Sequence, residues 1–242
     1  MADHLLAGAD QVKQLFDDKA AAWSSKYAPN GRLTGRLTRL THALNHLVPA
    51  GARVLDLGCA TGNLALTAAD DGLLVTACDI SEEMLRRASA ADVHGLVDWV
   101  KLAPDWQILP FEGQSFNVVL ASSVLEYVNE PAVILREAAR VLRPGGSLLC
   151  TVPNLAHPVR WLELTAILAA RLARISSSGR RWSRLRSYLT YLEVSRHRRT
   201  ERWWNAVAEQ AGLRPVKYAE EAKDHSPLRL LTFRSLGNAE EG

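Results

Sequence analysis

The stretch Val54-Leu55-Asp56-Leu57-Gly58-Cys59-Ala60-Thr61-Gly62-Asn63-Leu64 decides the fold, because an apolar strand runs directly into a small-residue turn that opens a helix. Glycine at 58 and 62 permits backbone conformations closed to other residues and lets the chain pass close to a ligand. The free N–H groups at the start of the helix point toward the same place. This layout is typical of α/β proteins that hold a nucleotide-like cofactor.

A second apolar run, residues 73–78, ends in Asp79, seventeen residues after Gly62. An acidic residue at the tip of that strand is placed to accept hydrogen bonds from the two ribose hydroxyls of an adenosine. A dinucleotide fingerprint, G-x-G-x-x-G, would need glycine at positions 58, 60 and 63, but the chain has Ala60 and Asn63. Asp56, leaving the first strand, suits a ligand with a cationic amino group and no pyrophosphate.

The same turn resembles motif I of the class I S-adenosylmethionine-dependent methyltransferases, which reads close to V-L-D-L-G-C-G-T-G. Ala60 replaces the middle glycine, and its methyl group is tolerated if the backbone there keeps an ordinary conformation. The resemblance implies S-adenosyl-L-methionine as the cofactor. It places Asp56, Gly58, Ala60, Gly62 and Asp79 among the cofactor-binding residues.

A second motif concerns the adenine. The stretch 105–111, D-W-Q-I-L-P-F, is similar to the family's D-A-x-x-L-P-F, with Trp106 in place of alanine. The resemblance implies that Asp105 reaches the adenine amino group and that the backbone N–H of Trp106 meets the ring. Ile80 and Ser122 complete the expected cofactor-binding set.

Two further motifs follow in the family's order. Residues 116–120 with 125–128 resemble the family's F-D-x-V…L-E-H-V, with Tyr127 where histidine is common. Residues 141–146, V-L-R-P-G-G, are similar to the L-x-P-G-G turn before the fifth strand. The resemblance covers about residues 50–153, and four ordered motifs are far more specific than one glycine loop.

From residue 53 onward, strand and helix patterns alternate, which predicts a parallel sheet with helices on both faces. We expect an α/β, Rossmann-like, seven-stranded and mostly parallel sheet whose last pair is antiparallel. The expected parts are an N-terminal helical cover (1–50), the cofactor-binding core (51–153), a basic helical insertion or substrate lid after the fifth strand (154–199) and the C-terminal part of the core (200–242). Expected strands are 53–57, 73–78, 97–102, 116–121, 147–152, 213–220 and 228–236, and expected helices include 62–70, 81–90, 131–142 and 200–211.

The composition indicates one globular unit. The chain has 242 residues, of which 48% are hydrophobic and 23% charged, and no run approaches the roughly 20 apolar residues that span a bilayer. Its start, M-A-D-H, lacks the pattern of a signal peptide, so we expect a cytoplasmic protein, with peripheral contact to a membrane as an alternative. The three cysteines, 59, 78 and 150, lie in expected core strands and suggest neither a metal site nor redox chemistry.

The charge is unevenly distributed. Residues 155–202 contain eleven arginines, no lysines and three glutamates, whereas the whole chain carries +3. This segment can be a solvated helical face, which is the commonest outcome, or can rest on an anionic membrane surface, or can grip an acidic substrate. No nucleic-acid partner is expected, because residues 122–124, S-S-V, lack the N/D-P-P-Y pattern of nucleobase amino methylation.

The resemblance implies in-line methyl transfer to a small-molecule acceptor, which gives S-adenosylhomocysteine. Oxygen is slightly favoured as the acceptor atom, because the pattern is closest to the quinone-biosynthesis O-methyltransferases. The candidate catalytic residues are Tyr127, next to Glu126 after the fourth strand, His157 after the fifth strand and His197 before the last large helix. The alternatives are an N- or C-methyltransferase of a lipid-like or carrier-bound metabolite, and a non-catalytic adenosyl-ligand-binding protein on the same fold.

Overall fold

The core is a seven-stranded sheet in the order β3-β2-β1-β4-β5-β7-β6. The first five strands along the chain pair in parallel, whereas β7 pairs antiparallel with both β5 and β6. This confirms the expected mostly parallel sheet with an antiparallel last pair. The strands are β1 (Arg53–Leu57), β2 (Leu74–Asp79), β3 (Val97–Lys101), β4 (Phe116–Ser122), β5 (Leu142–Pro153), β6 (Leu213–Val216) and β7 (Leu228–Ser235).

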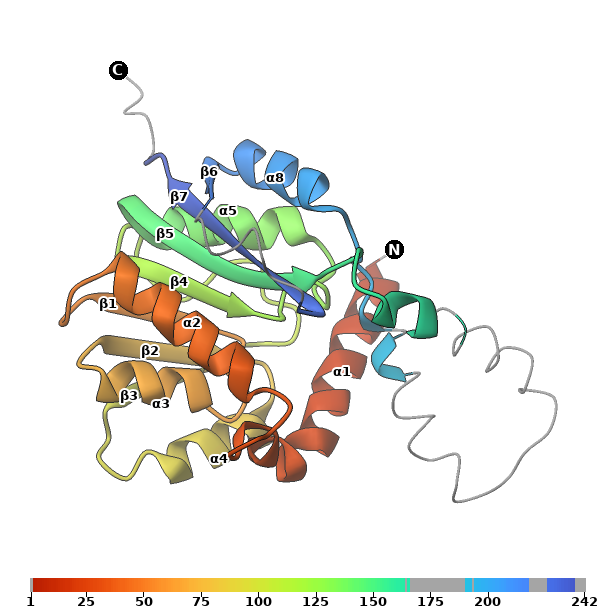
Figure 1. Cartoon of the computed structure of the whole chain (residues 1–242), viewed down its shortest axis with the longest axis horizontal. Helices are drawn as coiled ribbons and strands as arrows, with labels where there is room; N and C mark the ends of the chain where they lie inside the picture. Colours follow the sequence, from red (N-terminus) through yellow and green to blue (C-terminus); the bar gives the residue numbers. More distant parts are fainter. Residues whose placement is uncertain (1, 164, 166–189, 193, 218–225, 238–242) are drawn as a thin grey trace.

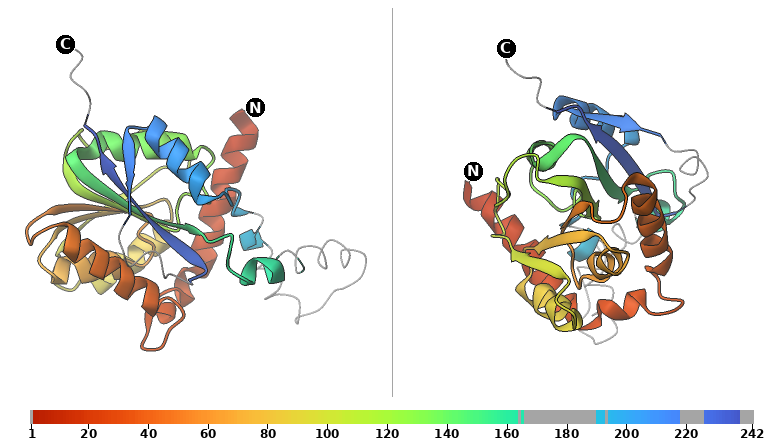
Figure 2. Two further views of the ribbon diagram at one scale, coloured as in Figure 1. Left: turned by 45° about the horizontal axis from the view of Figure 1, so that its top comes forward. Right: turned by 90° about the vertical axis from the view of Figure 1, so that its left-hand side faces the viewer.

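Helices cover both faces of the sheet in this computed structural model (Figures 1 and 2). On one face, α2 and α3 pack into a core with β1 and β2, as the buried side chains of Leu44 and Ala65 show. On the other face, α5 and α8 bury Leu135 and Trp204 against the sheet. The described helices are α1 (Ala2–Lys19), η1 (Ala20–Ala22), η2 (Ser24–Tyr27), α2 (Thr34–Leu47), α3 (Asn63–Asp70), α4 (Glu82–Ala91), α5 (Pro131–Val141) and α8 (Glu201–Gln210).

The N-terminal helices lie where the sheet presents its ligand-binding edge. In Figure 1, α1 stands beside the edge toward which β4 and β5 point, and ligands of open α/β sheets bind outside the carboxyl ends of their strands. Val12 and Leu15 of α1 form a small buried cluster with Tyr127, from the turn after β4. The N-terminal segment is therefore positioned as a cover of that edge.

Element boundaries agree with the sequence patterns to within a few residues, with two differences. The sequence predicts a turn at 143–146 and a strand from 147, but β5 already begins at Leu142, which pairs with Phe116. The register then shifts so that Val118 pairs with Ser147, and residues 143–146 bulge from the strand. The predicted strand 213–220 is described only as Leu213–Val216.

The structure describes residues 2–163, 165, 190–192, 194–217 and 226–237. The helices expected near 161–172 and 182–192 therefore lie largely outside the described residues, and the substrate-lid role of 154–199 stays a prediction. Within the described ranges, no helix is both long and apolar enough to cross a membrane.

Candidate functional site

One large cavity, of about 1150 Å³, lies at the carboxyl edge of the sheet. Its walls come from the glycine turn, the ends of β2 and β4, the N-terminal cover and the segments that flank the insertion. Nine of the twelve predicted site residues line it: Asp56, Gly58, Ala60, Asp79, Ile80, Asp105, Trp106, Ser122 and Tyr127.

The turn between β1 and α3 is shaped by left-handed backbone conformations. Gly58 has φ +71° and Gly62 has φ +75°. A Cβ at Gly58 would also lie 2.4 Å from Val124 Cγ2, so this position needs glycine for both backbone and space. Ala60 has φ +49°. From the sequence, its methyl group is expected to be tolerated in an ordinary backbone conformation, and this left-handed conformation is not one. The residue that departs from the family motif is the one held in a strained conformation.

Asp79 ties this turn to the end of β2. Its Oδ2 accepts a hydrogen bond from the backbone N–H of Ala60 at 2.8 Å, and its Oδ1 accepts one from the N–H of Ser81 at 2.8 Å. Burial raises the pKa of Asp79, while these N–H donors oppose the rise. Each carboxylate oxygen accepts more than one hydrogen bond, so capacity is left for ligand hydroxyls.

Two polar atoms at this end of the cavity lack a protein partner. Asp56 is 1% exposed, and its Oδ2 has no hydrogen-bond partner. The pKa of Asp56 is raised to about 7 by burial and by Asp79, with Arg36 opposing. The buried Oγ of Ser122 is likewise without a partner. Buried groups of this kind are costly unless satisfied, and a ligand bearing a cationic amino group would satisfy the carboxylate.

Gly62 does not line the cavity. It is the N-cap of α3, and a Cβ there would lie 2.5 Å from Trp99 Cη2. The residue is thus required by helix packing and by its positive φ. The contact of Gly62 with a cofactor stays a prediction. The positive φ and the packing against Trp99 explain the need for glycine at this position without such a contact.

The turn after β4 brings a carboxyl group to the cavity. Glu126 is 1% exposed, lines the cavity and has an unpartnered Oε2. Burial raises its pKa to about 7. Tyr127 lines the cavity too, but its ring packs edge-on against Phe16 and Tyr191, and burial raises the pKa of its hydroxyl well above 10. Glu126 is therefore better suited than Tyr127 to accept a proton.

Arg36 of α2 reaches across the cavity to the same turn. Its Nη1 donates to Ser123 Oγ at 2.8 Å and its Nη2 to the Tyr27 hydroxyl at 3.0 Å. Its Nε is buried without a partner. Arg36 is not among the residues predicted from the motifs. A local signal existed, since Arg36 lies four positions before the buried Leu40 and so shares its inward helix face.

The two predicted histidines lie outside the lining. His157 Nδ1 accepts a hydrogen bond from the N–H of Val159 at 3.1 Å, within the turn after β5. His197 is half-buried, with Nε2 3.2 Å from the carbonyl of Asn129, and burial lowers its pKa. Neither histidine lines the cavity that Tyr127 lines, and their catalytic roles stay predictions.

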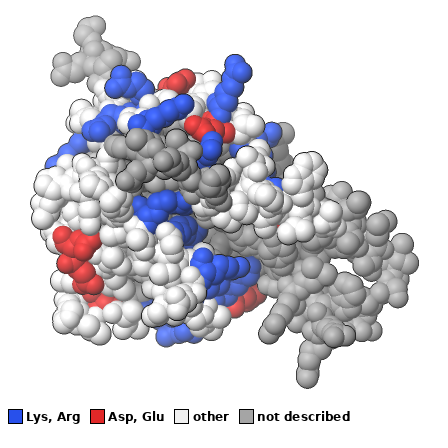
Figure 3. Space-filling model, in the orientation of Figure 1, with Lys and Arg blue, Asp and Glu red and all other residues white. Residues whose placement is uncertain are grey.

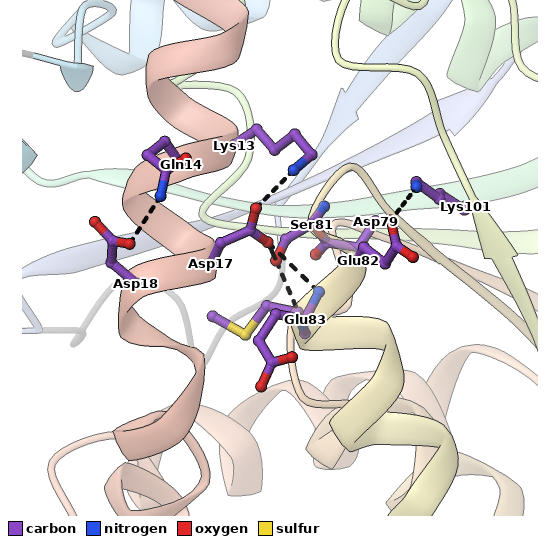
Figure 4. Close-up of polar contacts among 10 residues, drawn as sticks. Lys13, Gln14, Asp17, Asp18, Asp79, Ser81, Glu82, Glu83 and Lys101 are labelled. Atoms are coloured by element: carbon purple, nitrogen blue, oxygen red, sulfur yellow. Dashed lines mark hydrogen bonds and ion pairs between the residues drawn. The ribbon is translucent and has the colours of Figure 1, made fainter.

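The cover is fastened to the core beside the cofactor end (Figure 4). Asp17 of α1 accepts hydrogen bonds from Ser81 Oγ at 2.5 Å and from the N–H of Glu83 at 3.4 Å. Ser81 is also the N-cap of α4, as predicted, and its Oγ accepts from Met84 N–H. A carboxylate at this helix N-terminus is favoured by the helix dipole, so Asp17 holds α1 next to Asp79.

The segments that flank the insertion bring Arg160, Glu163 and Arg198 to the wall of the cavity. Glu163, 5% exposed, receives Arg160 Nη1 and Arg198 Nη1, each at 2.6 Å from Oε2. Arg160 Nη2 also donates to the Pro227 carbonyl at 2.6 Å. Arg198 Nη2 remains buried without a partner. These contacts join both ends of the insertion to the strand β7 that follows.

Comparison with known proteins places the motif region in a family. A model described as "Methyltransferase domain" matches residues 55–150. The ubiquinone biosynthesis O-methyltransferase of Xanthomonas oryzae pv. oryzae is 37% identical over 147 residues, which cover 58% of this chain and 59% of that protein. The 27-O-demethylrifamycin SV methyltransferase of Amycolatopsis mediterranei is 37% identical over 151 residues, which cover 59% of this chain and 54% of that protein.

Solved structures of methyltransferases share the fold. An S-adenosylmethionine-dependent methyltransferase from Mesorhizobium loti superposes with a TM-score of 0.57 at 23% identity, covering 80% of this chain and 96% of that one. The chain spans only about three fifths of the length of the curated relatives it matches. The match to the family model, residues 55–150, covers the core that carries the glycine turn, β2 and the turn after β4.

Proposed function

Since this chain contains a class I S-adenosylmethionine-dependent methyltransferase domain over residues 55–150, we propose that it transfers a methyl group from S-adenosyl-L-methionine to a small-molecule acceptor. An oxygen acceptor is slightly favoured, in keeping with the named O-methyltransferases among the relatives. The observation that carries the proposal is the single cavity in which the unpartnered Asp56 Oδ2 and the unpartnered Glu126 Oε2 both occur. Asp56 Oδ2 suits the amino group of the cofactor, and Glu126 Oε2 suits the reacting group of an acceptor.

The residues present fit the cofactor. Asp79 keeps acceptor capacity for ribose hydroxyls at the end of β2. Asp56 Oδ2 would hold the amino group of the amino-acid tail, and Ser122 Oγ is a further unsatisfied group nearby in the lining. Asp105 and Trp106 line the same cavity and would flank the adenine. The strained turn at Ala60 brings backbone rather than a long side chain to this end.

The cofactor supplies a methyl group on a positively charged sulfur, so the protein's task is alignment and exclusion of water. Glu126 Oε2 would take the proton of an acceptor hydroxyl, and the oxygen would keep the electron pair with which it bonds the methyl carbon. The carbon–sulfur bond would break at the same time, and sulfur would keep its electron pair. The Arg36 guanidinium, hydrogen-bonded to Ser123, would stabilise the developing negative charge. Above pH 7 the Glu126 carboxyl is ionised and able to accept the proton.

Two alternatives stay open. A nitrogen acceptor on a lipid-like or carrier-bound metabolite needs less help from a base and would leave Glu126 without this role, whereas a carbon acceptor would still need Glu126 to take a proton. A non-catalytic adenosyl-ligand-binding protein on the same fold is favoured only by the strained Ala60.

Peripheral membrane contact has one supporting observation, since Trp161 is 74% and Leu162 68% exposed near the start of the insertion. Flotation with anionic and neutral vesicles tests that contact.

The test of the proposal is calorimetry with S-adenosylhomocysteine and with NAD, followed by transfer of labelled methyl groups to catechol acceptors. We expect binding of the former alone. Asp79→Ala should reduce that binding at least about 100-fold, because two ribose hydrogen bonds to a charged group are lost. Asp98→Ala, an exposed carboxylate on β3 outside the cavity, is the matched control. No binding of S-adenosylhomocysteine would refute the proposal, and binding without methyl transfer would favour the non-catalytic alternative.

A further inference from the structure

The wall of the cavity formed by the N-terminal cover is cationic. Lys19, Lys26, Arg32 and Arg36 all line it, and they come from the end of α1, from η2, from the turn before α2 and from the start of α2. Among the described residues, none of the four forms an ion pair with a carboxylate. Figure 3 shows Lys and Arg side chains near the middle of the face that it presents. Unpaired cations that share one cavity are unfavourable unless something neutralises them.

The lysines lie against aromatic rings instead of carboxylates. Lys26 Nζ is 3.3 Å from the centroid of the Trp23 ring, and Lys19 Nζ is 4.8 Å from that of Tyr191. Burial, together with the charges of Arg32, Lys19 and Arg36, lowers the pKa of Lys26 to about 7. An anion in the cavity would reverse this effect.

Two guanidinium groups have hydrogen-bond donors left over. Arg36 Nε and Arg198 Nη2 are both buried without a partner, and both residues line the cavity. Arg36 approaches from α2 and Arg198 from the segment before α8, and the charges of both act on Tyr191. An anion with several acceptor oxygens, such as a carboxylate or a phosphate, is the chemistry that satisfies such donors.

The acidic residues in the lining leave Arg36 Nε and Arg198 Nη2 without a hydrogen-bond partner. Glu163 is already shared by Arg160 and Arg198. Asp18 is exposed and receives a hydrogen bond from Gln14 at 2.8 Å. Asp56 and Asp79 lie at the cofactor end, and the Arg36 charge acts both on Asp56 and on Glu126. Among the described residues, neither Lys26 nor Arg36 forms an ion pair with any of these carboxylates.

We propose that the methyl acceptor carries a carboxylate or phosphate group, which Lys26, Arg36 and Arg198 bind while Glu126 faces the reacting hydroxyl. This inference rests on the proposed function and adds the class of substrate. It also moves the anion site: the sequence offers the arginine-rich insertion as the grip for an acidic substrate, whereas the described cations belong chiefly to the N-terminal cover.

The test uses the full chain loaded with S-adenosylhomocysteine and three probes of matched size: benzoate, phenyl phosphate and neutral benzamide. We expect at least one anion to bind about tenfold or more tightly than benzamide, as measured by calorimetry, since charge-assisted pairs contribute most of the affinity. The stronger of the two anions identifies carboxylate or phosphate. Equal binding of all three probes, or binding of neither anion, would overturn the inference.

Variants separate this site from general surface charge. Lys26→Met and Arg198→Gln should each reduce the anion preference by about fivefold or more, whereas Arg214→Gln, an exposed arginine of β6 outside the cavity, should leave it unchanged. S-adenosylhomocysteine affinity should stay within about twofold in all three variants, because none of these residues lies at the cofactor end. A preference that survives both cavity variants would overturn the inference while leaving the proposed function intact. Loss of S-adenosylhomocysteine binding by the unmodified chain would instead refute the proposed function.

Discussion

Ala60 shows how one methyl group shapes the cofactor turn. Its φ of +49° is held by the hydrogen bond from its N–H to Asp79 Oδ2 at 2.8 Å. For an L-residue this conformation costs about 1–2 kcal/mol, which glycine avoids. The chain keeps the turn because Asp79 and the glycines on either side determine its course, so the departure from the motif changes the energy of the turn and leaves its shape intact.

Ala60→Gly should therefore stabilise the protein modestly. Relief of strain exceeds the about 0.4–1 kcal/mol by which glycine favours the unfolded chain, so we expect a gain of about 0.5–1 kcal/mol in thermal denaturation. S-adenosylhomocysteine should bind at least as tightly to the variant. Ala90→Gly, on the exposed side of α4, is the control and should destabilise by about 1 kcal/mol. Equal losses in both variants would show that Ala60 is unstrained.

Glu126 is the residue on which the pH dependence of activity should depend. With a pKa of about 7, its carboxylate form increases as pH rises through neutrality, and kcat/KM should rise with it. Glu126→Gln should lower kcat/KM about 100-fold or more and remove this rise. Asp56 and Lys26 also have a pKa of about 7, so the loss of the pH dependence in the variant identifies the group. Glu130→Gln, an exposed carboxylate in the same lining, is the control.

Glu126→Gln should lower activity but raise the free energy of unfolding at alkaline pH. Burial raises the pKa of Glu126 from 4.5 to about 7, so its contribution to folding is fully present below pH 4.5 and is lost as pH rises through 7. A glutamine carries no charge at pH 8, and Glu126→Gln should then unfold at higher denaturant than the unmodified chain, by up to about 3 kcal/mol. A variant that is both inactive and destabilised at pH 8 would instead indicate a structural carboxylate.

At the scale of elements, α1 is attached to α4 by one carboxylate. Burial raises the pKa of Asp17, but hydrogen bonds from Lys13 and Ser81 outweigh this, so its pKa lies below 3.8. Its contribution to folding is therefore present above pH 3.8 and is lost as pH falls through the lowered value. Asp17→Asn should weaken the attachment by about 1 kcal/mol, seen as faster amide exchange in α1 at neutral pH. Asp18→Asn changes the neighbouring carboxylate, which is exposed, and should not change the amide exchange of α1.

The elements were largely predictable because their signals are local. Ser81 with the glutamates after it marks the start of α4, and the buried run ending in Asp79 marks β2. The bulge after Leu142 was not predictable, because it depends on pairing with Phe116, far away in sequence. The cofactor end of the site could be inferred from a contiguous motif. Arg36 and Arg198 could not, since their roles arise from contacts between segments distant in the chain.

At the scale of the whole molecule, the cavity is lined by parts that lie far apart in the chain. The cover, the carboxyl edge of the sheet and the segments flanking the insertion all line it. Each supplies a different chemistry: the core turn supplies carboxylates and backbone, the cover supplies cations, and the flanking segments supply two arginines that share Glu163. A ligand that spans the cavity would therefore link the cover to the core.

Binding of S-adenosylhomocysteine should slow amide hydrogen exchange beyond its own contacts. We expect protection in the turn around Ala60 and also in α1 and the start of α2. A ligand that binds only the native state stabilises every element whose opening breaks the site. The stabilisation is about 2.7 kcal/mol when the ligand concentration is about a hundred times Kd. The helix α8, which does not line the cavity, should gain protection only to the extent that it opens by global unfolding. Exchange measured with and without ligand at one pH checks this pattern. Protection confined to the turn would mean that the cover opens independently of the cofactor, and that the cations on it reach the acceptor only after the cofactor is in place.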